Sequence, residues 1–337
     1  MHNSLQYSGV ALLENNDSFF LWYAGEASDG KKLTVDMPMQ IASVSKPFCA
    51  AAIMVLMHQK KLHLTDTLRQ FFPELPYANI TIEALLSHSS GLPEYIFFTD
   101  HNWEDKSVEV NNENIIPYMA KNKPKCYFEP GKKHRYTNTN YILLACIVEK
   151  ISGKKYPIFL KENIFVPLGM NQSRVLEHNE KYSRLPVKGH YGNGITFQPD
   201  FQDGTYGEKN IISTVWDLYR FYLGLKNNVL FPKELKEEMF RTRWERTRAG
   251  ADYALGWRKR IHHGESWIFH TGWWHGFRSN LYINLQSNKF AATLSNRLSG
   301  GFIYGNLLTG MFDENVFSSQ MGETFQRKNT VLKDNAD

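Results

Sequence analysis

The chain has 337 residues, of which 42% are hydrophobic, and this is enough to bury a large core in one compound domain or in two closely packed ones. Such a composition excludes disordered and fibrous proteins. The 39 basic and 34 acidic residues give a net charge of +5 and are scattered in both signs, so the charge pattern does not indicate a nucleic-acid partner.

Neither a membrane span nor a signal peptide is indicated. The longest apolar run, residues 48–57, is far shorter than the roughly 20 residues that a membrane helix needs. The first nine residues, MHNSLQYSG, lack the features of a signal peptide, although a mature exported form would look the same. Cys49, Cys126 and Cys146 are too widely spaced for a disulfide framework or a metal pair, and we expect them to be buried as small hydrophobic residues.

The chain begins with sheet and continues into a buried helix. Residues 9–13 and 18–24 are rich in apolar and aromatic side chains, and the polar turn between them predicts a β-hairpin. Pro47 is tolerated only in the first turn of a helix, so the next helix should begin close to Ser43. Residues 48–57 are apolar on every face, which is typical of a helix in the middle of a protein.

Between residue 64 and about residue 205 the pattern becomes helical and rich in loops. Helices are expected at residues 82–87, 115–120 and 140–151, each followed by turn-forming residues. We interpret residues 66–204 as an inserted helical subdomain.

Strand patterns return in the last third and should close the sheet that the first residues begin. Strands are expected at residues 267–273, 279–285 and 290–295, and helices at residues 214–225, 233–239 and 306–312. The sheet subdomain would then consist of residues 1–65 and 205–312. Residues 313–337 form a polar tail that we expect to be frayed.

The stretch QIASVSKPFC places Ser43 and Lys46 three positions apart at the start of the buried helix. A serine hydroxyl needs a base within hydrogen-bond reach to act as a nucleophile, and residues three apart share one helix face. Desolvation and the positive end of the helix dipole both loosen the proton on a lysine there. The alternative is a helix N-cap followed by an exposed lysine.

Two further segments offer groups of matching chemistry. In Tyr136-Thr137-Asn138, just before an apolar helix, the tyrosine could shuttle a proton and the asparagine could bind a substrate amide, or both could be structural. His270-Thr271-Gly272 lies on an expected strand, and a glycine there indicates a close approach, either of the helix that carries Ser43 or of a substrate.

Together, Ser-x-x-Lys, Tyr-x-Asn and His-Thr-Gly in this order resemble the motifs of the serine β-lactamase and penicillin-binding protein superfamily. The chain is most similar to the branch of class C β-lactamases and DD-peptidases, where Tyr-x-Asn replaces Ser-x-Asn. LLSHSSGLPEY at residues 85–95 and YALGW at residues 253–257 support this, and His88, Gly91 and Pro93 are expected to be structural. The resemblance implies an α/β (α+β) fold, with a mostly antiparallel sheet flanked by helices and an inserted all-helical subdomain.

The resemblance also implies a role for each motif residue. Ser43 would be the nucleophile, Lys46 its proton acceptor and Tyr136 the second acid/base. The substrate would be bound by Asn138, His270, Thr271 and Gly272. Backbone N–H groups of Ser43 and Trp273 would form the oxyanion hole, in which one donor contributes about 3 kcal/mol to the transition state. The resemblance implies no metal and no cofactor.

The sequence departs from the β-lactamase pattern at the third motif. His270 stands where lysine is usual, so a permanent positive charge for a substrate carboxylate is missing unless His270 is protonated. Trp273 and Trp274 follow, and they either narrow the pocket or pack against the neighbouring strand. The basic stretch 132–135 is expected to be a solvated turn. We assign no deacylating glutamate; Tyr136 is the family's usual candidate.

We therefore expect a metal-independent serine hydrolase that acts through an acyl-enzyme at Ser43 on an amide, peptide or ester carbonyl. DD-peptidase-like or esterase-like activity comes first, and a true class C-type β-lactamase or a catalytically silent binding protein are the alternatives. The partner would be a small-molecule or peptide substrate. We expect a periplasmic or other extracytoplasmic location with the signal removed, while a cytoplasmic esterase and the oligomeric state stay open.

Overall fold

The computed structural model describes residues 8–16, 18–28, 30–177, 185–262, 264–298 and 312, and the backbone of residues 324–326. The expected helix at residues 306–312 and most of the expected tail lie outside this part of the chain. Within the tail, Thr324–Gln326 forms strand β13 and pairs with β2 (Ser18–Ala24), so this short piece is not frayed. No described helix is long and apolar enough to cross a membrane.

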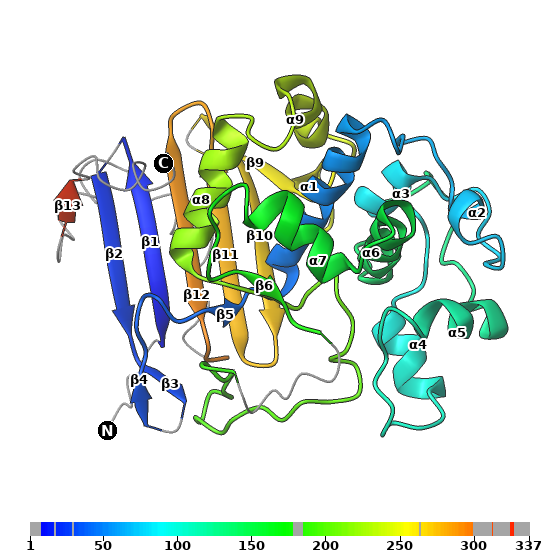
Figure 1. Ribbon diagram of the computed structural model, residues 1–337, viewed down its shortest axis with the longest axis horizontal. Helices are drawn as coiled ribbons and strands as arrows, with labels where there is room; N and C mark the ends of the chain where they lie inside the picture. The colour runs from blue at the N-terminus through cyan, green and yellow to red at the C-terminus, as the bar shows by residue number, and fades with distance from the viewer. Residues whose placement is uncertain are drawn as a thin grey trace.

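An eight-stranded sheet with the strand order β13-β2-β1-β12-β11-β10-β9-β8 forms one side of the molecule (Figure 1). Its other strands are β1 (Gly9–Asn15), β8 (Asp252–Tyr253), β9 (Arg258–His262), β10 (Glu265–Trp274), β11 (Phe277–Asn284) and β12 (Lys289–Ser295). All its strand pairs are antiparallel. The pairing of β1 with β12 joins the two ends of the chain in one sheet, which confirms the expected hairpin, late strands and fold class.

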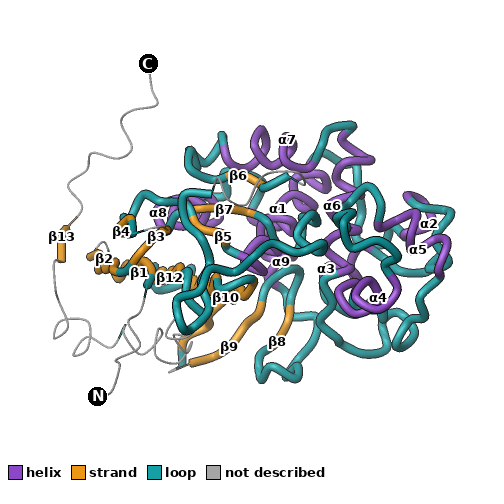
Figure 2. The backbone as a smooth tube through the Cα atoms, turned by 90° about the horizontal axis from the view of Figure 1, so that it is seen from below, coloured by secondary structure: helices purple, strands orange, loops and turns teal. Residues whose placement is uncertain are grey.

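The helix α1 (Ser45–His58) runs between this sheet and most of the other helices, as Figures 1 and 2 show. Its residues from Ser45 to Leu56 are all buried, as the apolar pattern predicted. The helix α8 (Val215–Lys226) covers the sheet at β1 and β12. The remaining helices are α2 (Leu68–Phe71), α3 (Ile82–Leu86), α4 (Tyr95–Asn102), α5 (Ile115–Asn122), α6 (Thr139–Ser152), α7 (Tyr156–Leu160), η2 (Lys161–Phe165) and α9 (Lys233–Phe240).

The helices α2 to α6 gather on the side of α1 that is remote from the sheet (Figure 1). Two small sheets complete the fold: β3 (Glu26–Ser28) pairs with β4 (Lys31–Lys32), and β7 (Ile211–Ser213) lies between β5 (Met39–Gln40) and β6 (Arg174–Val175). Because β5 leads directly into the segment that holds Ser43, the small three-stranded sheet anchors the entry to α1.

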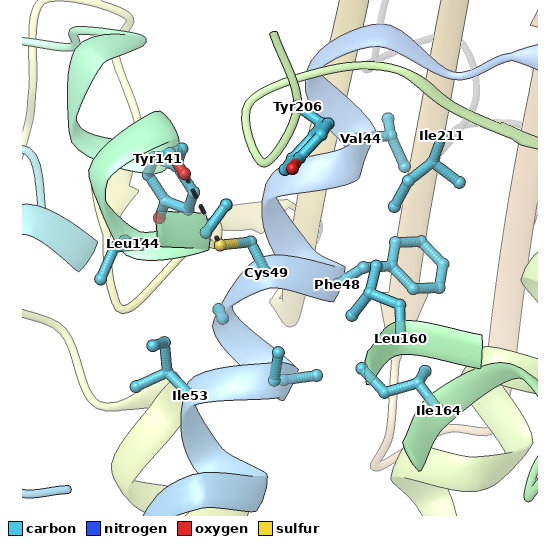
Figure 3. Close-up of a cluster of buried hydrophobic side chains, with 14 of the residues drawn as sticks. Val44, Phe48, Cys49, Ile53, Tyr141, Leu144, Leu160, Ile164, Tyr206 and Ile211 are labelled. Atoms are coloured by element: carbon cyan, nitrogen blue, oxygen red, sulfur yellow. Dashed lines mark hydrogen bonds between the residues drawn. The ribbon is translucent and has the colours of Figure 1, made fainter. Parts of the chain in front are cut away.

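The hydrophobic core surrounds α1 (Figure 3). Phe48 stacks on Phe221 of α8 with ring centroids 4.0 Å apart, and the Cys49 thiol lies 3.9 Å from the carbonyl oxygen of Tyr141. Burying a side chain such as Phe48 stabilises the fold by about 1.5–3 kcal/mol, so α1 is a rigid base for whatever its first turn carries.

The expectation for the cysteines is wrong at one position. Cys49 and Cys146 are buried, but Cys126 is exposed. Cys49 and Cys146 lie on α1 and α6, which pack against each other, whereas Cys126 lies in the loop between α5 and α6. Loops run over the surface of a protein, where a small apolar residue finds no layer to cover it.

Candidate active site

Ser43 lies in a short turn rather than in α1 itself. The turn η1 (Ala42–Val44) is a 3-10 helix, and α1 begins at Ser45. Ala42 has a φ of 47°, a left-handed conformation that costs a non-glycine residue about 1–3 kcal/mol and is concentrated at functional sites. Ser45 faces away from this side of the turn, where its hydroxyl accepts a hydrogen bond from the Ile211 N–H at 3.2 Å.

The ammonium group of Lys46 is completely buried and holds the centre of the site. Its Nζ donates to Ser43 Oγ at 2.9 Å, to Asn138 Oδ1 at 2.8 Å and to the Glu208 carbonyl oxygen at 3.0 Å. The three N–H groups of a lysine thus each have an acceptor. The alternative of a serine N-cap followed by an exposed lysine is wrong, because Val44 is the N-cap of α1 and Lys46 has no exposed surface.

The ring of Tyr136 lies beside this ammonium group. Lys46 Nζ is 4.9 Å from the ring centroid, within the range of a cation–π contact. The Tyr136 ring also contacts the ring of His88, and the two ring centroids are 4.2 Å apart. Burial, reinforced by Lys46 and other nearby cations, holds the pKa of His88 well below its usual range, so His88 stacks as a neutral ring. Its place in the turn after α3 agrees with the expected structural role.

Asn138 stands at the N-terminus of α6 and bridges Lys46 to a buried carboxylate. Glu94 Oε2 accepts from the Asn138 backbone N–H at 2.8 Å and from Asn138 Nδ2 at 3.2 Å. Burial raises the pKa of Glu94, although the Asn138 N–H and the charge of Lys46 act against that rise. Sequence reasoning missed Glu94, which lies 44 positions before Asn138 in the LLSHSSGLPEY segment.

His270 does not supply the positive charge that a lysine would provide at this position. It is completely buried, and burial together with Arg258 and Lys46 holds its pKa well below the usual value. Its Nδ1 lies 2.9 Å from the Thr271 carbonyl oxygen, to which only a protonated Nδ1 can donate. Nε2 is then the acceptor that faces the Tyr253 hydroxyl at 3.4 Å, so His270 is a neutral ring.

Arg258 provides a cation at this place instead, and sequence reasoning missed it. Its Nη1 donates to Thr271 Oγ1 at 3.2 Å, and its guanidinium carbon lies 5.5 Å from the centroid of the Tyr136 ring. Arg258 is opposite Phe269 in the pairing of β9 with β10, and Thr271 lies two residues further on the same face of β10. Arg258 reaches the site only through this strand register, and the sequence contains no local pattern that predicts its position there.

Gly272 allows the turn of Ser43 to lie against β10. A Cβ atom at Gly272 would lie 2.4 Å from the Ile41 carbonyl oxygen and 2.9 Å from the Ser43 nitrogen. The Ser279 hydroxyl on β11 donates to the same Ile41 oxygen at 2.5 Å and ties the turn to the sheet. The close approach expected from a glycine within a strand is confirmed, and its neighbour is the Ser43 segment.

The two tryptophans after the third motif behave differently. Trp273 is 60% exposed, and its ring lies 5.8 Å from the Arg278 guanidinium carbon, so it stands at the surface rather than packing into the sheet. The Trp274 Nε1–H donates to Asp203 Oδ1 at 2.6 Å, and Lys209 Nζ lies 4.8 Å from its ring centroid. Trp274 therefore ties the end of β10 to the loop that precedes β7.

The basic stretch 132–135 is a mostly solvated turn, as expected. Lys132, Lys133 and Arg135 are exposed, and the Arg135 guanidinium lies 3.5 Å from the centroid of the Tyr127 ring. His134 is half-buried, and burial, with Arg258 nearby, lowers its pKa to about 4.

Among the described residues, one group has the composition of a metal site. Ligand atoms of Asp200, Asp203 and His275 lie within 4.8 Å of one another. The Asp203 oxygen that faces His275 Nε2 at 3.1 Å also accepts the hydrogen bond of Trp274, so the group is accounted for as the anchor of that ring.

Known proteins resemble this chain in sequence and in fold. A penicillin-binding protein of Bacillus subtilis (strain 168) is 31% identical over 319 residues, which cover 87% of this chain and 68% of that protein. A teichoic acid D-alanine hydrolase of Staphylococcus aureus is 25% identical over 246 residues, covering 70% of this chain and 58% of that protein. The crystal structure of a penicillin-binding protein from Bacillus halodurans matches with a TM-score of 0.79 and 21% identity, covering 91% of this chain and 96% of that one.

The chain is a serine hydrolase that acts on an amide or ester carbonyl. Its fold, the hydrogen bond between Ser43 and the buried Lys46, and these relatives agree on this. The family model described as Beta-lactamase matches residues 5–309. The chain therefore belongs to the beta-lactamase family, which confirms the resemblance found in its motifs.

Proposed function

We propose that the protein hydrolyses a peptide, amide or ester bond next to a D-amino acid residue. The reaction passes through an acyl-enzyme at Ser43. The observation that carries this proposal is the fully buried Lys46 Nζ, 2.9 Å from Ser43 Oγ. A base at this distance can take the hydroxyl proton directly, which is the requirement for a serine nucleophile.

Acylation follows from the positions of these groups. In the reacting form Lys46 is the free amine. It keeps two N–H donors for Asn138 Oδ1 and the Glu208 carbonyl oxygen, and its lone pair takes the proton of Ser43 Oγ as that oxygen attacks the substrate carbonyl. Backbone N–H groups of Ser43 and Trp273 hold the oxygen that becomes negative. As the tetrahedral intermediate collapses, the leaving group departs with a proton that Tyr136 and Lys46 supply between them.

Deacylation reverses the same proton path. A water molecule replaces the leaving group, Tyr136 together with Lys46 takes one of its protons, and the resulting hydroxide attacks the ester carbonyl of acylated Ser43. The bond between the carbonyl carbon and Oγ breaks, and Oγ regains a proton from Lys46. Lys46 Nζ lies 4.9 Å from the centroid of the Tyr136 ring, so the two residues to which we assign this proton are neighbours.

Substrate selection is assigned to the groups around the third motif. Arg258, with Thr271, offers a charge and a hydroxyl to a substrate carboxylate, while Asn138 orients the acyl side and the neutral His270 shapes the pocket. The names of the relatives give the chemical class: one is a penicillin-binding protein and another is a teichoic acid D-alanine hydrolase. A D-alanyl group next to the scissile bond fits both.

The first test is the intact mass of the protein during incubation with benzylpenicillin, with Ser43→Ala measured in parallel. We expect a long-lived adduct of one penicillin that is absent from Ser43→Ala. Rapid release of penicilloic acid would instead identify a β-lactamase, and an adduct without turnover of any D-alanyl ester or peptide would identify a silent binding protein. Full hydrolytic activity in Ser43→Ala would overturn the proposal.

Location and domain division are part of the same proposal. D-alanyl groups of a cell wall lie outside the cytoplasm, so we propose an extracytoplasmic protein. We also propose that residues 66–204 are a helical subdomain and that the substrate enters between it and the sheet. Cell fractionation with an antibody against the protein tests the location.

A further inference from the structure

We infer that Glu94 is a positioning residue that sets the orientation of the Asn138 amide and, through it, the position of Lys46. The inference rests on the proposed function, because it concerns the same proton acceptor. Four groups form one chain of hydrogen bonds: Glu94 Oε2 with Asn138 Nδ2 at 3.2 Å, Asn138 Oδ1 with Lys46 Nζ at 2.8 Å, and Lys46 Nζ with Ser43 Oγ at 2.9 Å.

The polarity of this chain leaves one orientation for the amide. An ionised carboxylate only accepts hydrogen bonds and an ammonium only donates them, so Asn138 must turn its Nδ2 toward Glu94 and its Oδ1 toward Lys46. A reversed amide would set donor against donor at Lys46 and acceptor against acceptor at Glu94. Both contacts are partly buried, where such a mismatch costs more than in water.

Glu94 itself is held rigidly. The residues on either side of it are tied to the first residue of α6: Thr139 Oγ1 donates to the Pro93 carbonyl oxygen at 2.6 Å and accepts from the Tyr95 N–H at 2.8 Å. Asn138, the neighbour of Thr139, gives Glu94 its backbone N–H as well. The carboxylate and the amide are therefore fixed relative to each other by three additional hydrogen bonds.

The burial of the Glu94 carboxylate costs more free energy than a purely structural role would justify. The residue is 9% exposed, and no donor among the described residues has hydrogen-bond geometry at its second oxygen, Oε1, although the nearby Ile96 N–H also favours the ionised form and lowers the pKa. A buried carboxylate with half of its acceptors unused loses solvation without full compensation. The two Asn138 donors bind the ionised carboxylate more strongly than a neutral carboxyl group. Burial, which raises the pKa of Glu94, places the loss of this charge above the pH of an ordinary glutamate.

The consequence for the reaction is a dependence on the charge of Glu94. Glu94 exchanges no proton with the substrate; it holds Oδ1 of Asn138 as an acceptor for Lys46. When pH falls through the raised pKa of Glu94, Oε1 takes up the proton and Oε2 stays an acceptor as a carbonyl oxygen. The two charge-assisted hydrogen bonds from Asn138 then become weaker, neutral ones, and the amide is held less firmly. Acylation should therefore slow on the acid side through a group that never touches the substrate.

The test compares Glu94→Gln with the native protein and with the matched control Glu149→Gln. Glu149 also accepts a backbone N–H, from Tyr156 at 2.8 Å, but it lies further along α6, where it also accepts the Tyr206 hydroxyl. The acylation rate is followed as the burst of p-nitrophenol from p-nitrophenyl acetate between pH 5 and 9, with the rate of Ser43→Ala subtracted.

We expect Glu94→Gln to lower the acylation rate about tenfold, because an amide oxygen still accepts the two Asn138 hydrogen bonds but more weakly than a carboxylate. Glu94→Met, which offers no acceptor, should lower it on the order of 100-fold, the loss that a misplaced catalytic group causes. Because the new side chain of Glu94→Gln is uncharged at every pH, the acylation rate of this variant should also lack the fall at low pH that protonation of Glu94 causes in the native protein. Glu149→Gln should keep the native rate and profile. A Glu94→Gln protein with the native rate and native pH profile would overturn the inference and leave the role of Ser43 intact.

A measurement that does not need activity separates the two proposals. In a crystal structure of Glu94→Met, which removes both acceptors, the distance between Asn138 Oδ1 and Lys46 Nζ should exceed about 3.5 Å, the limit of a hydrogen bond. An unchanged contact would contradict the inference even if no ester is hydrolysed. Absence of Ser43-dependent acylation in the native protein, together with a displaced Asn138, would overturn the proposed function alone.

Discussion

The guanidinium of Arg258 on β9 donates a hydrogen bond to Thr271 Oγ1 on β10 at 3.2 Å, next to the neutral and buried His270. The positive charge of the third motif therefore comes from a neighbouring strand. This relationship predicts how the protein distinguishes charged from neutral substrates.

Replacing Arg258 by Gln should lower kcat/KM for a peptide with a free D-alanyl carboxylate about 10- to 100-fold. The reason is that a hydrogen bond to a charged group contributes about 1.5–3 kcal/mol, and 1.4 kcal/mol corresponds to tenfold. Steady-state hydrolysis of D-alanyl-D-alanine peptides measures this. The neutral p-nitrophenyl acetate should be hydrolysed at nearly the native rate, and Arg260→Gln, on the same strand, serves as the control. Equal losses on both substrates would contradict a carboxylate-binding role.

Lys46 should be essential as a base rather than as a charge. Lys46→Ala is expected to lower the acylation rate about 100- to 10,000-fold, which is the usual contribution of a general base. Lys46→Arg should not restore activity, because a guanidinium does not give up its proton. The measurement is the rate of adduct formation with benzylpenicillin by intact mass. Restoration by arginine would show that Lys46 acts only electrostatically.

Gly272→Ala should impair the site by displacing the backbone. Its Cβ would meet the Ile41 carbonyl oxygen at 2.4 Å and the Ser43 nitrogen at 2.9 Å, so the turn of Ser43 must shift. We expect a loss in acylation rate of about 100- to 1,000-fold, the effect of losing one oxyanion donor.

The control for this variant is Gly224→Ala in α8, where the three atoms nearest to the added Cβ all belong to the side chain of Leu168. It should lower the melting temperature without changing the acylation rate per folded molecule. If Gly272→Ala acylates at the native rate, the close contact between β10 and the Ser43 turn has no part in catalysis.

The stability of the protein should fall as the solution becomes acidic. Burial holds the pKa of His88 and His270 well below the usual value, so both stay neutral in the folded state while the unfolded chain takes up protons below about pH 6.5. Each should therefore cost up to about 1.4 kcal/mol of unfolding free energy per pH unit below that point. Urea unfolding at pH 5.5, 6.5 and 7.5 measures the slope.

His270→Asn should show a smaller slope than the native protein below pH 6.5 and a parallel curve above pH 7.5. An identical slope would mean that His270 is protonated in the folded state. The dependence of activity on pH should lead to the same conclusion. Because His270 is already neutral, its titration should cause no change in activity near neutral pH.

The general architecture follows from local patterns in the sequence. An apolar run without a polar face must be buried, so residues 48–57 could be placed at the centre of the fold, and alternation with turn residues located the hairpin and the late strands. The spacing of Ser43 and Lys46 sufficed to bring them together, because both belong to one turn of chain. The order of the three motifs then indicated the family.

Contacts between distant segments depend on register and burial, which no local pattern contains. Arg258 reaches Thr271 only because β9 pairs with β10 with Arg258 opposite Phe269. Glu94 meets Asn138 only because the start of α4 packs on the start of α6. No local pattern in the sequence indicated that Trp273 and Cys126 are exposed. The sequence by itself determined the elements, the family and the reacting pair; only the tertiary structure decided which charges surround that pair, because a charge acts through distance and desolvation rather than through its place in the chain.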